Sequence, residues 1–178
     1  MVTINEWHNR RMKLNQLHPW QVTPMEGIAI QERLAAKVSF VNRISSPVSH
    51  IARVDISSPD EQGIATGAVV ILNFPDLDVV EVRVPRVKPI IPYIPRLLSF
   101  REIPVLAGVL EALSLTPDII LVDGQGFAYP RRFGLACHLG LLADTPTIGC
   151  AKSILRGKHD KLSMEQATYV PLCDRGSL

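Results

Sequence analysis

Hydrophobic and polar positions alternate in two stretches of the first half of the chain, and this alternation predicts strands with one buried face. In the stretch 50–56, Asp55 lies on the face opposite to Val54, and the stretch 80–84 alternates in the same way. The long apolar stretch 64–74 between them predicts a further strand. Short turns join the three, so an antiparallel meander is expected. Pro85 favours an edge position for its last strand.

A fourth strand is predicted by the unbroken aliphatic run at 119–122. Such runs are typical of strands that are covered on both faces at the centre of a sheet. Asp123, Gly124 and Gly126 follow directly. Because open α/β sheets bind their ligands beyond the carboxyl ends of the strands, Asp123 is a candidate site residue.

Helical periodicity predicts three helices around these strands. The first begins at a capping box formed by Thr23 and Glu26 and is expected to reach Val41. The second is expected to begin near Phe100, because proline at position 104 is tolerated only about the first turn. A third helix is expected at 133–143, a strand at 147–151 and a helical turn at 164–169. Residues 1–22 are interpreted as an irregular leader, and 23–178 as the domain.

Composition limits the class of protein. The chain has 178 residues, a net charge of +2 and three widely spaced cysteines, which do not suggest a disulfide framework. No apolar run approaches the roughly 20 residues that span a bilayer. A soluble, cytoplasmic monomer with no membrane association is expected. The charge is too small to indicate a polyanionic partner by itself.

Three acids stand out by position: Asp55 on the first strand, Glu102 on the apolar stripe of the second helix, and Asp123. The order of elements predicts an α/β, ribonuclease-H-like mixed sheet, in which the antiparallel meander is followed by parallel strands with flanking helices. In that fold the first and fourth strands are neighbours. Clustered carboxylates are typical ligands of Mg²⁺ or Mn²⁺, which indicates phosphodiester hydrolysis. For Glu102, a capping box with Ser99 is the alternative.

Other candidates have equally ordinary alternatives. Tyr93 lies in a proline-rich loop that would present its ring rigidly, but it could equally be a packed aromatic. Lys152 could be a solvated strand end, and His138 is expected to pack or to form hydrogen bonds. Gly124 and Gly126 lack the third glycine of a dinucleotide-binding fingerprint, because Tyr129 stands at its position.

Several motifs together resemble endonuclease V, the deoxyinosine 3′ endonuclease of DNA repair. They are Pro92-Tyr93-Ile94-Pro95, Leu98-Ser99-Phe100-Arg101-Glu102, Val122-Asp123-Gly124-Gln125-Gly126, Pro130-Arg131-Arg132-Phe133-Gly134, Cys137-His138-Leu139-Gly140 and Pro146-Thr147-Ile148-Gly149-Cys150-Ala151-Lys152. The resemblance extends from about Thr23 to the end of the chain.

The resemblance implies a Mg²⁺-dependent enzyme, with Mn²⁺ as a second possible ion, that cuts the second phosphodiester bond 3′ to a deaminated base. It implies that Asp55, Glu102 and Asp123 are the metal-site and catalytic residues and that Lys152 lies near the scissile phosphate. The implied partner is double- or single-stranded DNA with deaminated bases, and some family members also cut inosine-containing RNA. The implied DNA-binding residues are Pro92, Tyr93 as the wedge, Ile94, Pro95, Leu98, Gly124, Gly126, Arg131 and Arg132.

The chain departs from the family pattern at two of these motifs and at its end. Tyr129 stands where histidine is usual, and Arg96 stands where glycine is usual. The family usually continues into a further strand and helix with a Gly-His-Arg segment, so the chain is interpreted as shortened after Leu178. Two other hypotheses remain open: a protein that binds lesion DNA without cutting it, and a structural or nucleotide-binding α/β domain.

Overall fold

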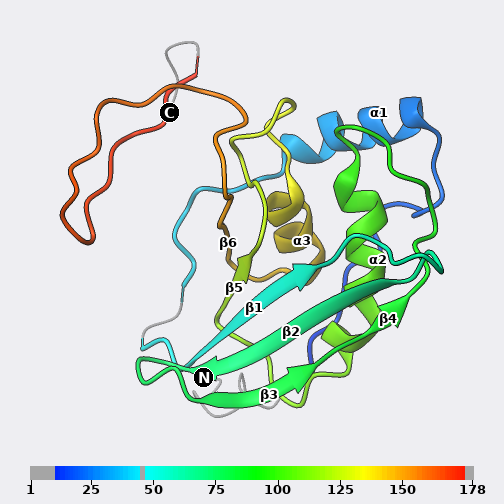
Figure 1. The fold of residues 1–178 in the computed structure, drawn as a ribbon, viewed down its shortest axis with the longest axis horizontal. Helices are drawn as coiled ribbons and strands as arrows, with labels where there is room; N and C mark the ends of the chain where they lie inside the picture. The colour runs from blue at the N-terminus through cyan, green and yellow to red at the C-terminus, as the bar shows by residue number, and fades with distance from the viewer. Residues whose placement is uncertain (1–10, 45–46, 175–178) are drawn as a thin grey trace, which may run out of the picture.

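The structure, a computed structural model, describes residues 11–44 and 47–174. Three helices and six strands alternate along it (Figure 1). In chain order they are α1 (Pro24–Ala35), β1 (His50–Ile56), β2 (Ala65–Asn73), β3 (Val79–Arg83), β4 (Arg86–Val87), α2 (Leu98–Glu111), β5 (Ile119–Val122), α3 (Leu135–Ala143) and β6 (Thr147–Gly149).

The strands form one mixed sheet in the order β3-β2-β1-β5-β6. Strands β1, β2 and β3 pair antiparallel, while β5 pairs parallel with both β1 and β6. The expected meander, the edge position of its last strand and the pairing of the first strand with the run at 119–122 are therefore confirmed. The two-residue strand β4, which pairs with β2, was not predicted.

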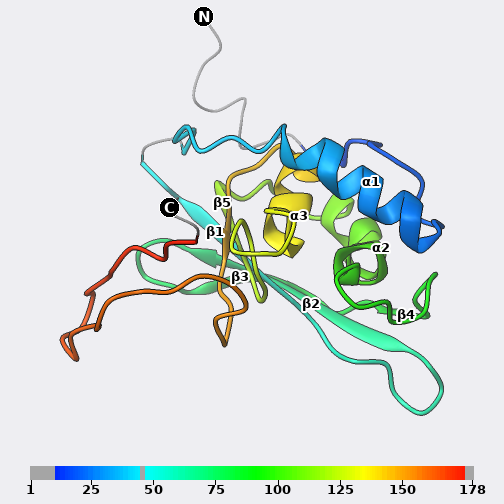
Figure 2. The same ribbon diagram turned by 90° about the horizontal axis from the view of Figure 1, so that it is seen from above.

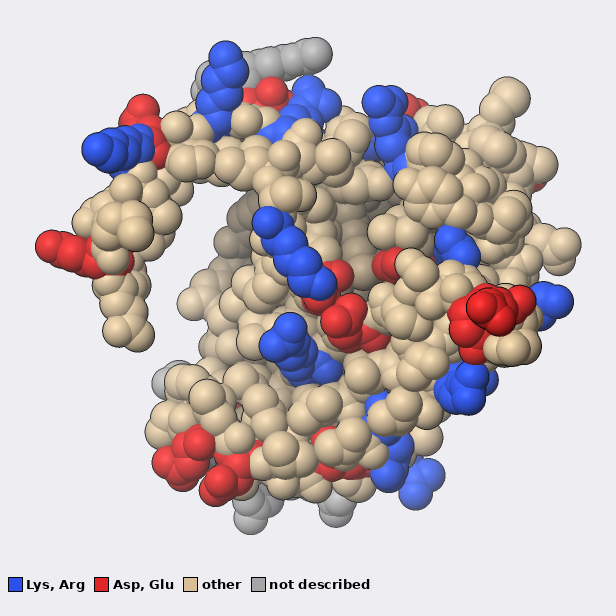
Figure 3. Space-filling view, in the orientation of Figure 1, with Lys and Arg blue, Asp and Glu red and all other residues tan. Residues whose placement is uncertain are grey.

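The three helices lie on one face of the sheet (Figures 1 and 2). Along β5, Ile120 and Val122 are fully buried beneath them, whereas Ile119 and Leu121 are only half-buried. The prediction that this run is covered on both faces is therefore wrong for the part of the chain that the structure describes. On the open face, acidic side chains gather in a hollow and basic side chains flank them (Figure 3).

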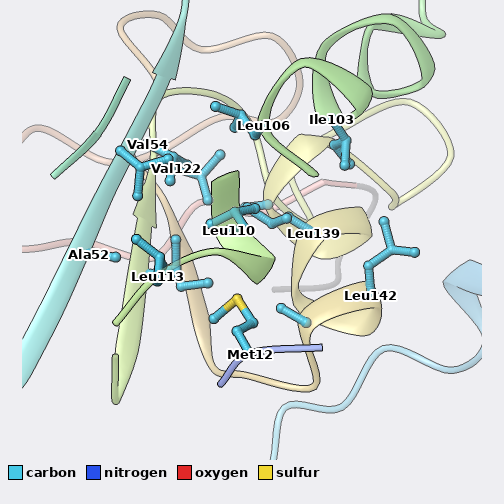
Figure 4. Close-up of a cluster of buried hydrophobic side chains, with 14 of the residues drawn as sticks. Met12, Ala52, Val54, Ile103, Leu106, Leu110, Leu113, Val122, Leu139 and Leu142 are labelled. Atoms are coloured by element: carbon cyan, nitrogen blue, oxygen red, sulfur yellow. The ribbon is translucent and has the colours of Figure 1, made fainter. Parts of the chain in front are cut away.

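The main core lies between the sheet and helices α2 and α3 (Figure 4). The stripe predicted for the second helix comprises Leu106, Val109, Leu110 and Leu113. Leu106 and Leu110 on α2, and Leu113 just beyond its end, are fully buried, whereas Val109 is only partly buried. The described part of the leader has no helix or strand, in agreement with the sequence, yet it packs on this core through Met12. At roughly 25 cal/mol per Å² of apolar surface, this one continuous core is the main source of stability.

Two helix predictions were wrong in their bounds. The capping box of Thr23 and Glu26 forms as expected, but α1 ends at Ala35 instead of Val41. Val41 is 74% exposed, so no core contact rewards continuing the helix that far. Helix α2 begins at Leu98, two residues before the expected start, and Pro104 lies inside it. Burial of the whole apolar stripe outweighs the one backbone hydrogen bond that proline cannot donate.

Residues 150–174 extend away from the sheet and double back, and Lys158 and Cys173 pair across them (Figure 1). The helical turn expected at 164–169 does not form; bends and a turn occupy this stretch, and Met164 is fully exposed. The shorter limits of α3 and β6 also differ from the sequence expectation by two residues each. None of the helices in the described ranges is both long enough and apolar enough to span a membrane.

Candidate active site

Strand pairing brings Asp55 and Asp123 together. Val54 pairs with Val122 across the parallel strands β1 and β5; Asp55 follows Val54 on β1, and Asp123 directly follows the end of β5. The backbone N–H of Asp123 donates to the carbonyl of Val54 at 3.0 Å, which continues the ladder by one step. Two residues 68 positions apart in sequence thus lie side by side at the carboxyl ends of two neighbouring strands.

Glu102 projects toward the same two acids from the first half of α2. Burial is the main cause that raises the pKa of its carboxyl to about 7, and the charges of Asp55 and Asp123 raise it further. The alternative capping box does not form, because Leu97 is the N-cap of α2 and the hydroxyl of Ser99 bonds to His138 instead. A capping role therefore does not account for the position of Glu102.

The Lys152 ammonium pairs with one of these acids. Its Nζ lies 2.7 Å from Oδ2 of Asp123, a buried oxygen that makes no hydrogen bond of normal geometry to any other group in the described residues. This ammonium is the main cause that lowers the pKa of Asp123, and the carboxylate in turn raises the pKa of Lys152. The lysine side chain is 82% exposed, so it can leave the acid at little cost.

These residues fit a divalent cation by their chemistry. Carboxylate oxygens are the ligands of Mg²⁺ and Mn²⁺, and a cation would relieve the repulsion that raises the pKa of Glu102. As placed, however, no three His, Cys, Asp or Glu side chains in residues 11–44 and 47–174 form a group that could hold a metal ion. For Asp123 to bind a cation, its carboxylate would first have to release the Lys152 ammonium.

A cavity of about 410 Å³ adjoins these acids. Glu102, Asp123 and Lys152 form one part of its lining, and Tyr93 and Tyr129 form another. The remaining lining residues include Pro95, Leu98 and Gly124 from the expected set, together with Gln31, Arg96, Phe133 and Leu155. The cavity thus combines acidic residues with aromatic and apolar ones in its lining.

Tyr93 and Tyr129 differ in exposure at this cavity. The Tyr93 ring is 62% exposed, with the Arg101 guanidinium 5.9 Å from its centre, so it is not the packed aromatic of the alternative interpretation. Tyr129 is half-buried, and burial is the main cause that raises the pKa of its phenol. At neutral pH Tyr129 therefore stays protonated and can donate a hydrogen bond into the cavity.

Residues at the start of α3 hold the loop that follows Asp123 beside the cavity. The backbone N–H groups of Gly134 and Ala136 donate to the carbonyls of Gly126 and Gln125 at 2.9 and 3.1 Å. A Cβ at position 134 would lie 2.3 Å from the Gln125 carbonyl oxygen, so only glycine permits this contact. Of the two expected loop glycines, Gly124 lines the cavity and Gly126 borders two neighbouring pockets.

Arg131 and Arg132, which the sequence suggested as phosphate contacts, both have partners within the protein. Arg131 donates to Gln31 and to the carbonyl of Arg96. Arg132 pairs with Asp174 and stacks over the ring of Phe127, 5.1 Å from its centre. Their contact with phosphate remains a prediction, and the structure adds an internal role for each.

His138 is buried in a chain of hydrogen bonds. His18 donates from Nδ1 to the Pro19 carbonyl at 2.8 Å, which leaves its Nε2 to accept from Nε2 of His138 at 2.6 Å. Nδ1 of His138 then accepts from the Ser99 hydroxyl at 2.9 Å. Burial is the main cause that lowers the pKa of His138 to about 3, so both rings are neutral. As expected, His138 packs and bonds without reaching the acids.

Gln31 is the site residue that sequence reasoning missed. It lies on α1, is 1% exposed, and reaches the cavity with its amide. One signal was available: it precedes Leu34 by three positions, so a polar side chain stands on the buried stripe of the first helix. A buried amide needs hydrogen-bond partners, so a glutamine on a buried stripe indicates polar groups from another part of the chain beside it.

A family model described as Endonuclease V matches residues 32–178. The chain belongs to the endonuclease V family. The endonuclease V of Trichormus variabilis is 46% identical over 167 residues, which are 94% of this chain and 76% of that protein. The crystal structure of endonuclease V from Streptomyces avermitilis has a TM-score of 0.82 at 34% identity, covering 94% of this chain and 73% of that one. The fold is accordingly ribonuclease-H-like.

A further endonuclease V structure, from Ciona intestinalis, is a complex with DNA that contains an inosine followed by a ribo-adenosine. It has a TM-score of 0.67 and 33% identity, and it covers 76% of this chain and 61% of that one. Endonuclease V proteins are nucleases that process DNA. An acidic cluster beside an open cavity agrees with that activity.

Proposed function

We propose that this chain is a divalent-metal-dependent endonuclease that cuts DNA beside deaminated bases, with deoxyinosine as the main lesion and the second phosphodiester bond 3′ to it as the point of cleavage. The observation that carries the proposal is that Glu102 and Asp123 line one cavity together with Tyr93. The register of β1 and β5 places Asp55 beside Asp123.

The acids would hold Mg²⁺ or Mn²⁺. A bound ion of this kind polarises a phosphoryl oxygen and lowers the pKa of its water. The protein's own part is to keep Asp55 and Asp123 adjacent through the strand register and to keep Glu102 close by through α2. Lys152, once it leaves Asp123, is free to pair with a phosphate oxygen near the bond that is cut.

The aromatic end of the cavity would receive the base. Unstacking a base costs a few kcal/mol and costs less when its pairing is poor, so a rigid exposed ring such as Tyr93 helps to select a mispaired lesion. The phenol of Tyr129 and the backbone of the loop at Gly124 offer hydrogen-bonding groups to the base edge. The stiff proline-rich loop would hold the Tyr93 ring rigidly in the position that the displaced base leaves.

The test is cleavage of a duplex that contains one deoxyinosine, in Mg²⁺, by the wild type and by Asp123→Asn. The variant keeps the shape of the side chain but loses the charge that binds the cation, so we expect no detectable nick. Asp76→Asn, in the exposed turn between β2 and β3, is the matched control and should cut normally. Undiminished cleavage by Asp123→Asn would remove the mechanism.

One observation favours a second candidate, a protein that binds the lesion without cutting. In the described residues the donors do not yet form a metal group, and Lys152 neutralises Asp123. A gel-shift measurement beside the cleavage assay separates the two, because retention of deoxyinosine DNA without a nick supports the second candidate. Inosine-containing RNA in the same assays tests the other proposed substrate. Equal binding of inosine and adenine duplexes would instead favour a structural or nucleotide-binding domain.

A further inference from the structure

The loop that carries Tyr93 is fixed at one backbone carbonyl, that of Arg96. Nη2 of Arg131 donates to this oxygen at 2.7 Å, and Nε2 of Gln31 donates to it at 3.1 Å. Nε of Arg131 also donates to Oε1 of Gln31 at 2.6 Å. The three groups therefore close a ring of hydrogen bonds that joins α1, the Tyr93 loop and the loop before α3.

Gln31 is the buried member of this ring. Both ends of its amide have partners, and the side chain is 1% exposed. Arg96, by contrast, is exposed and its φ is +68°, in the left-handed region that residues other than glycine seldom adopt. The two donors hold the backbone of Arg96 in this unfavourable conformation.

This anchor lies three residues after Tyr93 in the same loop. Leu97 N–H donates to the Ile94 carbonyl at 3.0 Å, so the backbone turns tightly between the tyrosine and α2. Apolar contacts hold the loop from beneath, since Ile91, Leu97 and Phe100 form a small buried cluster against which Ile94 packs. The polar ring at Arg96 is the contact that fixes the loop's outer side relative to the cavity.

We propose that Gln31 is a positioning residue for lesion recognition: its amide, together with Arg131, sets the place of Tyr93 and thereby the preference for a deaminated base. The inference rests on the proposed function, in which Tyr93 acts as the wedge. It assigns to α1, which contributes none of the acids, a part in selecting the substrate. Arg131 then acts through the loop as well as on any phosphate it meets.

Three variants separate positioning from general stability. Gln31→Met keeps the length of the side chain but removes both of its hydrogen bonds. Gln31→Glu keeps the acceptor for Arg131 but replaces the donor to the Arg96 carbonyl by a second acceptor, so it should restore only the part of the behaviour that the Arg131 bond carries. Leu34→Val, one turn further along α1, loses core contact without touching the ring and serves as the control for loss of stability. Urea unfolding of all three provides the comparison of stability.

The first readout needs no DNA. The chain has three tyrosines, so 3-fluorotyrosine labelling gives three ¹⁹F resonances, and Tyr93→Phe identifies the relevant one. We expect Gln31→Met to move or broaden the Tyr93 resonance and Leu34→Val to leave it in place. An unchanged Tyr93 resonance in Gln31→Met would overturn the positioning role, whatever the enzyme cuts.

The second readout is kcat/KM for deoxyinosine duplex relative to undamaged duplex. Gln31→Met should lower this ratio about tenfold or more, because it removes two hydrogen bonds that each contribute modestly, and the loss should be mainly in KM. In a Tyr93→Ala background the same substitution should cause no further loss. A ratio in Gln31→Met equal to that of Leu34→Val, or losses that add fully with Tyr93→Ala, would overturn the inference. A wild type without any inosine preference would instead overturn the proposed function.

Discussion

Glu102→Gln offers a quantitative test of the acid cluster in the metal-free protein. The pKa of Glu102 is raised from 4.5 to about 7, chiefly by burial. A carboxyl whose pKa is higher in the folded state stabilises the fold below its unfolded pKa, and this contribution is lost as pH rises through the folded value. The wild type should therefore lose stability between pH 4.5 and 7, and the neutral amide should not.

The magnitude follows from the same two values. A difference of about 2.5 pH units at 1.36 kcal/mol per unit sets a ceiling of about 3 kcal/mol. Glu102 is only partly buried, so solvent screening reduces the expected effect to about 1–2 kcal/mol. At pH 8 Glu102→Gln should thus be more stable than the wild type by about that amount, and at pH 5 the two should nearly coincide.

The assay is urea unfolding in EDTA at several pH values, with Glu32→Gln on the exposed side of α1 as the control. Because groups outside the acid cluster titrate equally in both proteins, the difference between variant and wild type reports Glu102 together with its coupling to Asp55 and Asp123. Added Mg²⁺ should raise the stability of the wild type at pH 8 more than that of the variant, since a ligand stabilises the state it binds. A difference in stability that does not change from pH 5 to pH 8 would refute the reasoning.

Three further predictions concern the loop, the lysine and the buried histidine. Gly134→Ala should destabilise the protein by about 1–3 kcal/mol, because the added Cβ would overlap the backbone of Gln125. Gly108→Ala should stabilise it by about 0.5–1 kcal/mol, because a Cβ at this position inside α2 meets nothing within 4 Å. Thermal unfolding measures both changes. Lys152→Met should slightly lower stability to urea at neutral pH, because Asp123 loses its cationic partner, and it should lower kcat for deoxyinosine cleavage. An unchanged kcat would exclude the proposed role of Lys152. Burial lowers the pKa of His138 to about 3, so the neutral imidazole contributes stability that is fully present above pH 6.5 and is lost as the pH falls toward 3. The melting temperature of the wild type should therefore decline below pH 6.5. His138→Gln should weaken that decline.

Local chemistry made much of this protein readable from its sequence. The alternation of residues 50–56 and the aliphatic run at 119–122 specified strands, because side chains on a strand change face at every residue. The capping box at Thr23 specified where α1 begins, since its hydrogen bonds involve only neighbouring residues. The acids at 55, 102 and 123 were identifiable for the same reason, because each is a charged residue within or directly after a run of apolar positions.

Tertiary structure decided what depended on distant partners. Helix α1 ends at Ala35 because no core surface lies under Val41, and α2 accommodates Pro104 because burial of its stripe compensates for the lost bond. The pairing of Lys152 with Asp123 and the enclosure of Gln31 between two loops join residues about 30 to 100 positions apart. A sequence pattern records the face on which a residue lies, but its partner across the fold is fixed only when the elements pack.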